Sequence, residues 1–133
     1  LFTRSILDGQ PIKVFNRGEQ QRDFTYIDDI VEGLCRVLEE DVSKRSKTEK
    51  YQLFNIGKGK PVHLMDFISE IESQLGKEAL KEMMPMQPGD VPRTWADTEA
   101  LQARYGYHPA TDLKEGVASF LEWYLSYYQV QLP

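Results

Sequence analysis

Apolar residues recur at helical spacing in five segments of the chain. The third segment shows the pattern clearly, because Leu64, Ile68, Ile71 and Leu75 fall on one face of a helix with 3.6 residues per turn. A helix that buries one such face is the usual outcome of this spacing. The five predicted helices cover residues 1–8, 29–39, 64–75, 98–105 and 112–128.

Glycines and acidic residues mark the ends of several predicted helices. A glycine directly after the last apolar position commonly ends a helix, because it adopts left-handed backbone angles at little cost. Three glycines, Gly9, Gly76 and Gly106, stand in this place. Asp112 with Glu115, and Asp29 with Glu32, have the spacing of a capping box. We therefore expect Asp29 and Asp112 to be N-caps.

Shorter segments with apolar and β-branched residues predict strands. Residues 12–15 alternate, residues 51–56 and 79–84 are strand-like, and residues 22–26 form a further extended segment. The second predicted helix carries an apolar stripe of Ile30, Val31, Leu34 and Leu38, with Cys35 beside it. We expect Cys35 to be a small buried hydrophobe.

These elements predict an α/β class, as a mixed α+β fragment with few short strands and about five helices. The strands are too few and too scattered for a complete parallel sheet. We therefore expect their edges to pair with an N-terminal part outside this sequence, or with a second copy of the chain as a homodimer. The sequence has 133 residues and begins with Leu1 instead of Met. We interpret residues 1–133 as one C-terminal domain fragment of a longer protein.

Composition narrows the functional classes. The net charge of −5 argues against a general nucleic-acid binder. One cysteine excludes an internal disulfide, which suits the cytoplasm. No apolar run reaches the about 18–20 residues of a membrane span, so we expect no membrane partner. The two histidines, His63 and His108, lack the spacing of a metal site.

Arg22 is the first candidate for ligand binding. A guanidinium binds phosphate oxygens in pairs and keeps its charge at any working pH. The alternative is an ordinary surface ion pair with Glu19, Asp23 or Asp28, which contributes little.

Two further regions carry candidate residues. Phe15 can stack on a nucleobase, although packing in the core is the better explanation for an aromatic residue on one face of a strand. Residues 85–92 contain Pro85, Pro88, Gly89 and Pro92, which restrain the loop that presents Gln87 and Asp90. Asp90 can accept hydrogen bonds from sugar hydroxyls; alternatively, the loop only connects a strand to a helix.

Motifs along nearly the whole chain resemble the C-terminal portion of the extended short-chain dehydrogenases, the NAD-dependent epimerase/dehydratase family. The resemblance is greatest to its UDP-glucuronate 4-epimerase branch, through the Met-Gln-Pro-Gly-Asp-Val-Pro stretch. The motifs that carry it are residues 2–12, 22–30, 54–57, 86–92, 94–97 and 106–111.

The resemblance implies roles for three residues before the second helix. In the family, an arginine at the position of Arg22 binds the diphosphate. A residue at the position of Phe15 lines the base pocket, and the backbone at Lys13 contacts the uracil.

Three later residues also receive roles through the resemblance. Asp90 is placed near the ribose of a UDP-sugar. Gln87 stands where the sugar 4-epimerases have a second phosphate-binding arginine, which is compatible with the glucuronate branch. Asn55 matches a ligand-pocket position of related dehydratases.

The resemblance also implies what this sequence lacks. The family binds NAD on an N-terminal Rossmann domain with a glycine-rich turn. The sequence contains neither Gly-x-x-Gly-x-x-Gly nor the catalytic Tyr-x-x-x-Lys. We expect a fragment that is inactive alone, without catalytic or cofactor-binding residues. The alternatives are part of a dTDP-glucose 4,6-dehydratase-like lyase, or a non-catalytic nucleotide-binding or interaction module.

Overall fold

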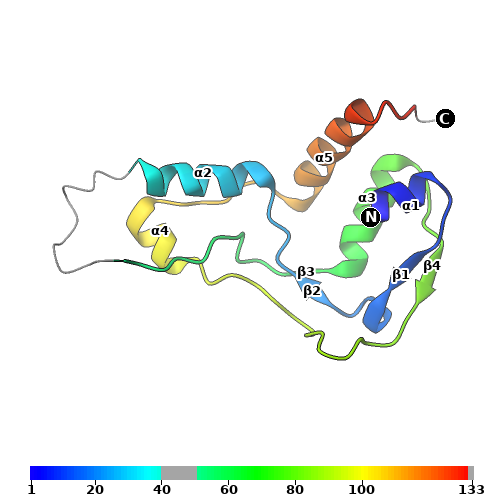
Figure 1. Cartoon of the computed structure of the whole chain (residues 1–133), viewed down its shortest axis with the longest axis horizontal. Coiled ribbons are helices and arrows are strands. Elements are labelled where there is room, and N and C mark those ends of the chain that lie inside the picture. Colours follow the sequence, from blue (N-terminus) through cyan, green and yellow to red (C-terminus); the bar gives the residue numbers. More distant parts are fainter. Residues whose placement is uncertain (40–50, 132–133) are drawn as a thin grey trace. The chain divides into compact units, whose positions relative to one another are not determined.

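The computed structural model describes residues 1–39 and 51–131, and the chain folds into two compact units. Unit 1 comprises Leu1–Arg22, Pro61–Thr94 and the segment from Asp112 onward. Unit 2 comprises Asp23–Lys60 and Trp95–Thr111. No helix in the described ranges is long and apolar enough to span a membrane. The elements are labelled in Figure 1.

Unit 1 contains most of the secondary structure. Its elements are α1 (Phe2–Leu7), β1 (Ile12–Val14), a 3-10 turn η1 (Phe15–Gly18), β2 (Gln21–Arg22), β3 (Val62–His63), α3 (Leu64–Leu75), β4 (Lys81–Met83) and α5 (Leu113–Tyr127). Strands β1 and β4 pair in parallel, with Ile12 opposite Lys81 and Val14 opposite Met83. Strands β2 and β3 form an antiparallel pair, in which Arg22 lies opposite Val62. The predicted mixture of helices with few short strands is confirmed.

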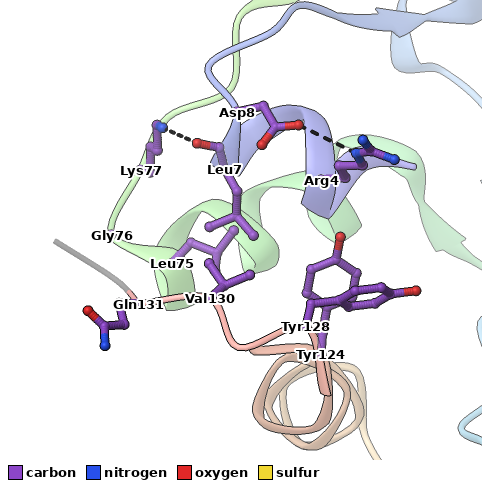
Figure 2. Close-up of a pocket in the computed structure, with 10 residues that line it drawn as sticks. All are labelled: Arg4, Leu7, Asp8, Leu75, Gly76, Lys77, Tyr124, Tyr128, Val130 and Gln131. Carbon is purple, nitrogen blue, oxygen red and sulfur yellow. Dashed lines mark hydrogen bonds and ion pairs between the residues drawn. The ribbon is translucent and has the colours of Figure 1, made fainter. Parts of the chain in front are cut away.

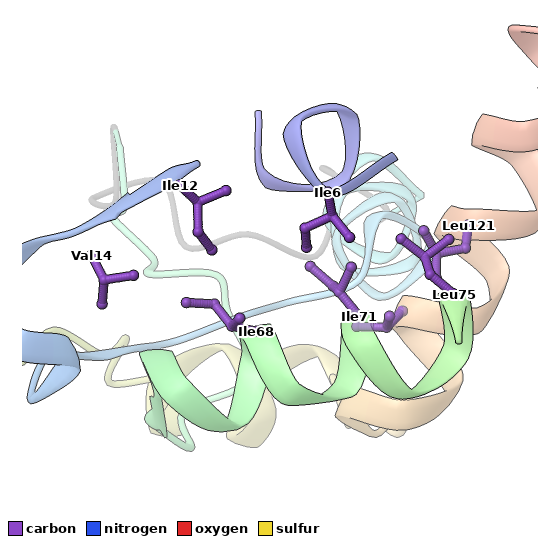
Figure 3. Packing of buried hydrophobic residues seen from close by; sticks show 8 residues of the cluster. Ile6, Ile12, Val14, Ile68, Ile71, Leu75 and Leu121 are labelled. Carbon is purple, nitrogen blue, oxygen red and sulfur yellow. The ribbon is translucent and has the colours of Figure 1, made fainter. Parts of the chain in front are cut away.

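The core of unit 1 lies between β1 and three helices. Ile12 and Val14 are buried on one face of β1, as strand alternation requires, and Ile68 meets them from α3, while Ile71 of α3 lies near Ile6 (Figure 3). The cluster also contains Ile6 from α1, Leu75 from α3, and Val117 and Leu121 from α5. The alternation that buries Ile12 and Val14 leaves Lys13 exposed.

A partly buried ion pair ties α3 to β4. The Glu72 carboxylate accepts hydrogen bonds from Lys81 Nζ and, at 2.7 Å, from the Ala79 backbone N–H. Burial opposes ionisation of Glu72, but the Lys81 and Ala79 contacts outweigh it and lower its pKa from the ordinary value of 4.5.

Glu72→Gln should therefore make unit 1 less sensitive to acid. A lowered pKa in the folded state means that the ionised carboxylate stabilises the fold above about pH 4.5, and that this stabilisation is lost as the pH falls. Urea unfolding at neutral and acid pH checks the difference. The exposed Glu78→Gln serves as the control and should follow the unsubstituted protein. An equal acid loss in Glu72→Gln and the unsubstituted protein would contradict this role.

Most predicted helices and their ends are confirmed. Gly76 and Gly106 have positive φ angles of 63° and 64° at the ends of α3 and α4 (Glu99–Tyr105). The Asp112 side chain accepts from the Glu115 N–H at 2.8 Å and so caps α5.

The prediction of an N-cap at Asp29 was wrong. Helix α2 spans Ile27–Leu38, its N-cap is Tyr26, and Asp29 lies within the first turn. Asp29 is buried, and its Oδ1 accepts from the Ala110 N–H at 3.2 Å. The Asp29 carboxylate thus binds the backbone of a distant segment and does not cap the helix, although its spacing to Glu32 had predicted a cap.

In unit 2, helix α2 packs through the face that carries its small and polar residues. Gly33 is buried, and a Cβ there would lie 2.6 Å from Ile56 Cδ1 and 3.0 Å from the Tyr107 ring. The apolar stripe points to solvent instead, since Val31, Leu34 and Leu38 are 47%, 52% and 82% exposed. Cys35 is also exposed, so the prediction that it is buried was wrong.

The strand predicted at residues 51–56 is not present. This segment has no ladder partner among the described residues, and Tyr51 and Leu53 are largely exposed. A strand needs a neighbour to satisfy its backbone groups, and local sequence does not supply one. Pairing of this edge with an N-terminal part or with a second copy stays a prediction.

Candidate functional site

Three left-handed residues turn the chain from β1 toward β2. Asn16, Arg17 and Gly18 have φ angles of 48°, 51° and 80°. A Cβ at Gly18 would lie 2.5 Å from Met65 Cγ, so a larger residue there would have to displace the Met65 side chain of α3. The turn leads into the short pair of β2 with β3, which carries Arg22.

Arg22 and the proline-rich loop meet in unit 1. Arg22 Nη2 donates to Asp90 Oδ1 at 2.7 Å, and both side chains are about one quarter exposed, at 27% and 26%. Arg22 Nη1 donates to the backbone carbonyl oxygens of Gln21 at 2.9 Å and Pro92 at 3.4 Å. The sequence suggested nearby carboxylates as ion-pair partners of Arg22. The observed partner, Asp90, is instead 68 positions away in the sequence.

The backbone holds the loop against β2. The Gln21 N–H donates to the Pro92 carbonyl at 2.8 Å, and the Thr94 N–H donates to the Gln21 carbonyl at 3.2 Å. Asp90 closes a tight turn, because its N–H donates to the Gln87 carbonyl at 3.1 Å across Pro88 and Gly89. Gly89 has a φ of 83°, as the third position of such a turn requires. The prediction of a restrained loop is confirmed.

Gln20 also contacts the loop, and sequence reasoning did not select it. Its side chain is 7% exposed, and its Nε2 donates to Asp90 Oδ2. Gln20 and Arg22 are two residues apart on an extended segment, so their side chains project to the same side. That spacing is the sequence signal that could have identified Gln20.

The structure brings together only some of the predicted site residues. Phe15 is half-buried in η1, and Lys13 is exposed on β1. The Gln87 side chain is exposed, and its backbone alone contacts Asp90. Asn55 is exposed in unit 2. Ligand roles for these four residues stay predictions.

The paired groups have the chemistry of an anion and hydroxyl site. A guanidinium has five N–H donors, and the contacts above use three. Two donors thus have no described partner and are suited to phosphate oxygens. Asp90 is an acceptor of the kind that sugar hydroxyls need. Across residues 1–39 and 51–131, no group of three His, Cys, Asp or Glu side chains converges as a metal site.

A cavity of about 770 Å³ lies elsewhere in unit 1, and Figure 2 draws the residues around it. Leu7, Leu75 and Val130 give it an apolar wall, and the rings of Tyr124 and Tyr128 lie 4.6 Å apart beside them. It contains none of the predicted site residues.

Comparison with known proteins identifies a family match. Residues 1–57 match the model of the NAD dependent epimerase/dehydratase family. The chain is 42% identical to protein CapI of Staphylococcus aureus, over 96% of this chain and 42% of that protein. It is 39% identical to a probable UDP-glucuronate 4-epimerase of Rhizobium meliloti, over 92% of this chain and 40% of that protein. The predicted resemblance is confirmed.

Solved structures agree with this match. The UDP-glucuronic acid 4-epimerase of Bacillus cereus, in complex with UDP-glucuronic acid and NAD, matches with a TM-score of 0.83 and 30% identity. The match covers 96% of this chain and 39% of that one. The chain thus spans about two fifths of the length of such relatives.

Proposed function

Because residues 1–57 match the model of the NAD dependent epimerase/dehydratase family, we propose that residues 1–133 are the substrate-binding C-terminal region of an NAD-dependent nucleotide-sugar epimerase. The reaction would interconvert UDP-glucuronate and UDP-galacturonate through a 4-keto intermediate. The observation that carries the proposal is the pairing of Arg22 with Asp90, since both were expected at the nucleotide from sequence motifs alone.

The two residues take separate roles at the ligand. Arg22 binds diphosphate oxygens through its remaining N–H donors and neutralises part of their charge. Asp90 accepts from the ribose hydroxyls, held beside Arg22 by the tight turn at Gly89. Both roles are binding and orientation, which fix where the sugar lies before any bond changes.

NAD does not fit this chain. Its pyrophosphate needs a glycine-rich turn at a helix N-terminus, and the sequence has no Gly-x-x-Gly-x-x-Gly. None of the seven tyrosines has a lysine four residues later, so the family's catalytic pair is also outside this sequence. NAD would supply hydride chemistry from a site elsewhere in the whole enzyme.

UDP-glucuronate is favoured as the substrate by the relatives. A probable UDP-glucuronate 4-epimerase of Rhizobium meliloti and UDP-glucuronate 4-epimerase 2 of Arabidopsis thaliana are 39% and 40% identical to the chain. A dTDP-glucose 4,6-dehydratase matches at 19% identity, which supports the fold alone.

The 133-residue chain alone should not interconvert UDP-glucuronate and UDP-galacturonate when NAD is added. The complete product of the gene that encodes it should do so, because that product would add the catalytic pair and the NAD site. Chromatography of the UDP-sugars after incubation measures both. Turnover by the chain alone would contradict its role as a binding region. A complete product that binds UDP but converts neither sugar would favour a non-catalytic nucleotide-binding module.

A further inference from the structure

We propose that Gln20 is a positioning residue of the nucleotide site, which acts on the ribose end of the ligand by holding Asp90. This inference rests on the proposed function. It assigns different partners to the two oxygens of one carboxylate. Gln20 holds Oδ2, and Arg22 contacts Oδ1.

The surroundings of Gln20 hold its side-chain amide donor in one position. Its side chain is 7% exposed, so its amide has little access to water. Its backbone carbonyl accepts from the Leu64 N–H at 2.9 Å, which anchors the residue beside β3. A buried donor without a partner is costly, so the amide favours the arrangement in which Asp90 stays in place.

The contacts of Oδ1 are the ones that a ligand can replace. Oδ1 accepts from Arg22 Nη2 at 2.7 Å and from the Val91 N–H at 3.0 Å. A phosphate that binds the remaining N–H donors of Arg22 neutralises the same cation and so weakens its attraction for Asp90. When it does so, the hydrogen bond from Gln20 keeps Asp90 at the site, and Oδ1 becomes an acceptor for a ribose hydroxyl.

A neutral amide suits this place better than a charged group. A carboxylate at position 20 would repel Asp90, and a second cation would compete with Arg22 for it. An amide binds Oδ2 without changing the charge that the diphosphate meets.

The inference is tested with two ligands on the complete gene product. Gln20→Ala should lower the affinity for UDP about 5- to 10-fold, the usual effect of losing one hydrogen bond in a buried site. Its affinity for inorganic pyrophosphate, which has no ribose, should change less than about 2-fold. Calorimetric titration measures both. The double variant Gln20→Ala/Asp90→Ala should bind UDP no more weakly than Asp90→Ala alone.

Gln20→Glu adds a pH signature and keeps the size of the side chain. The new carboxylate would face Asp90, so the pair must share a proton for the contact to form. The charged groups around it are Asp90 and Arg22 directly, and His63 through the Gln21 side chain. UDP affinity of this variant should fall as the pH rises, relative to that of the unsubstituted protein. A constant ratio would contradict the proposal.

The control is Gln74→Ala, which removes an amide that contacts Glu70 and the Lys114 carbonyl in unit 1, away from the site. It should leave the affinity for both ligands unchanged. Equal losses of UDP and pyrophosphate affinity in Gln20→Ala would indicate a merely structural role and overturn the inference. Unchanged affinity for both ligands in Arg22→Ala would instead overturn the proposed function.

Discussion

Arg22→Ala should lower the affinity of the complete gene product for UDP about 10- to 100-fold. Hydrogen bonds to a charged group contribute about 1.5–3 kcal/mol each, which corresponds to this range. The substitution also leaves Asp90 without the cation that it contacts at 2.7 Å. The remaining carboxylate would then repel the diphosphate. Calorimetric titration with UDP measures the loss directly.

Two further variants separate charge from geometry at position 22. Arg22→Lys keeps the positive charge but cannot bind two oxygens in one plane, so it should recover only part of the affinity. Arg4→Ala is the control, because Arg4 is a surface arginine of the same unit whose side chain is 79% exposed beside Asp8. It should bind UDP like the unsubstituted protein. Equal UDP affinity in Arg22→Ala and Arg4→Ala would exclude Arg22 from the site.

Tyr107→Ala should destabilise unit 2 by about 3–5 kcal/mol, the usual effect of removing a buried aromatic side chain. Tyr107 has no exposed surface, contacts the position of Gly33, and donates its hydroxyl to the Gly57 carbonyl at 2.9 Å. Tyr107→Phe keeps the ring and should lose about 1–2 kcal/mol through the unpaired carbonyl.

Trp95 fluorescence during urea unfolding reports on this unit. The chain has two tryptophans, so a Trp123→Phe background leaves Trp95 as the only one. Tyr127→Ala is the control, because Tyr127 is 67% exposed. A free energy of unfolding for Tyr107→Ala within about 0.5 kcal/mol of that control would contradict the packing role.

Alkaline pH gives a second measurement of the same contact. Burial, followed by the charges of Asp29 and Asp23, raises the pKa of Tyr107 to about 12. A raised pKa means that the stabilisation is complete below the ordinary value of 10 and is lost as the pH rises from there toward about 12. Tyr107→Phe should therefore lose less stability over this range than the unsubstituted protein.

The apolar stripe of α2 illustrates a limit of sequence patterns. Periodicity identified the helix correctly, but it did not identify which face packs inside unit 2. Gly33 faces inward where the helix approaches Ile56 and Tyr107 too closely for a larger side chain, and the buried Asp29 accepts from the Ala110 N–H. Amphipathic spacing measures where apolar groups lie on a helix, not which partner is present to cover them.

The sequence alone determined the helices of unit 1, the turns at their glycines, the capping of α5 and the resemblance to the family. These features depend on residues close together in the chain, so local spacing is sufficient to predict them. Tertiary structure decided the contacts among Gln20, Arg22 and Asp90, the inward face of α2 and the partner of Asp29. Each of these contacts joins groups from distant parts of the chain. A local sequence pattern does not show which distant groups will meet.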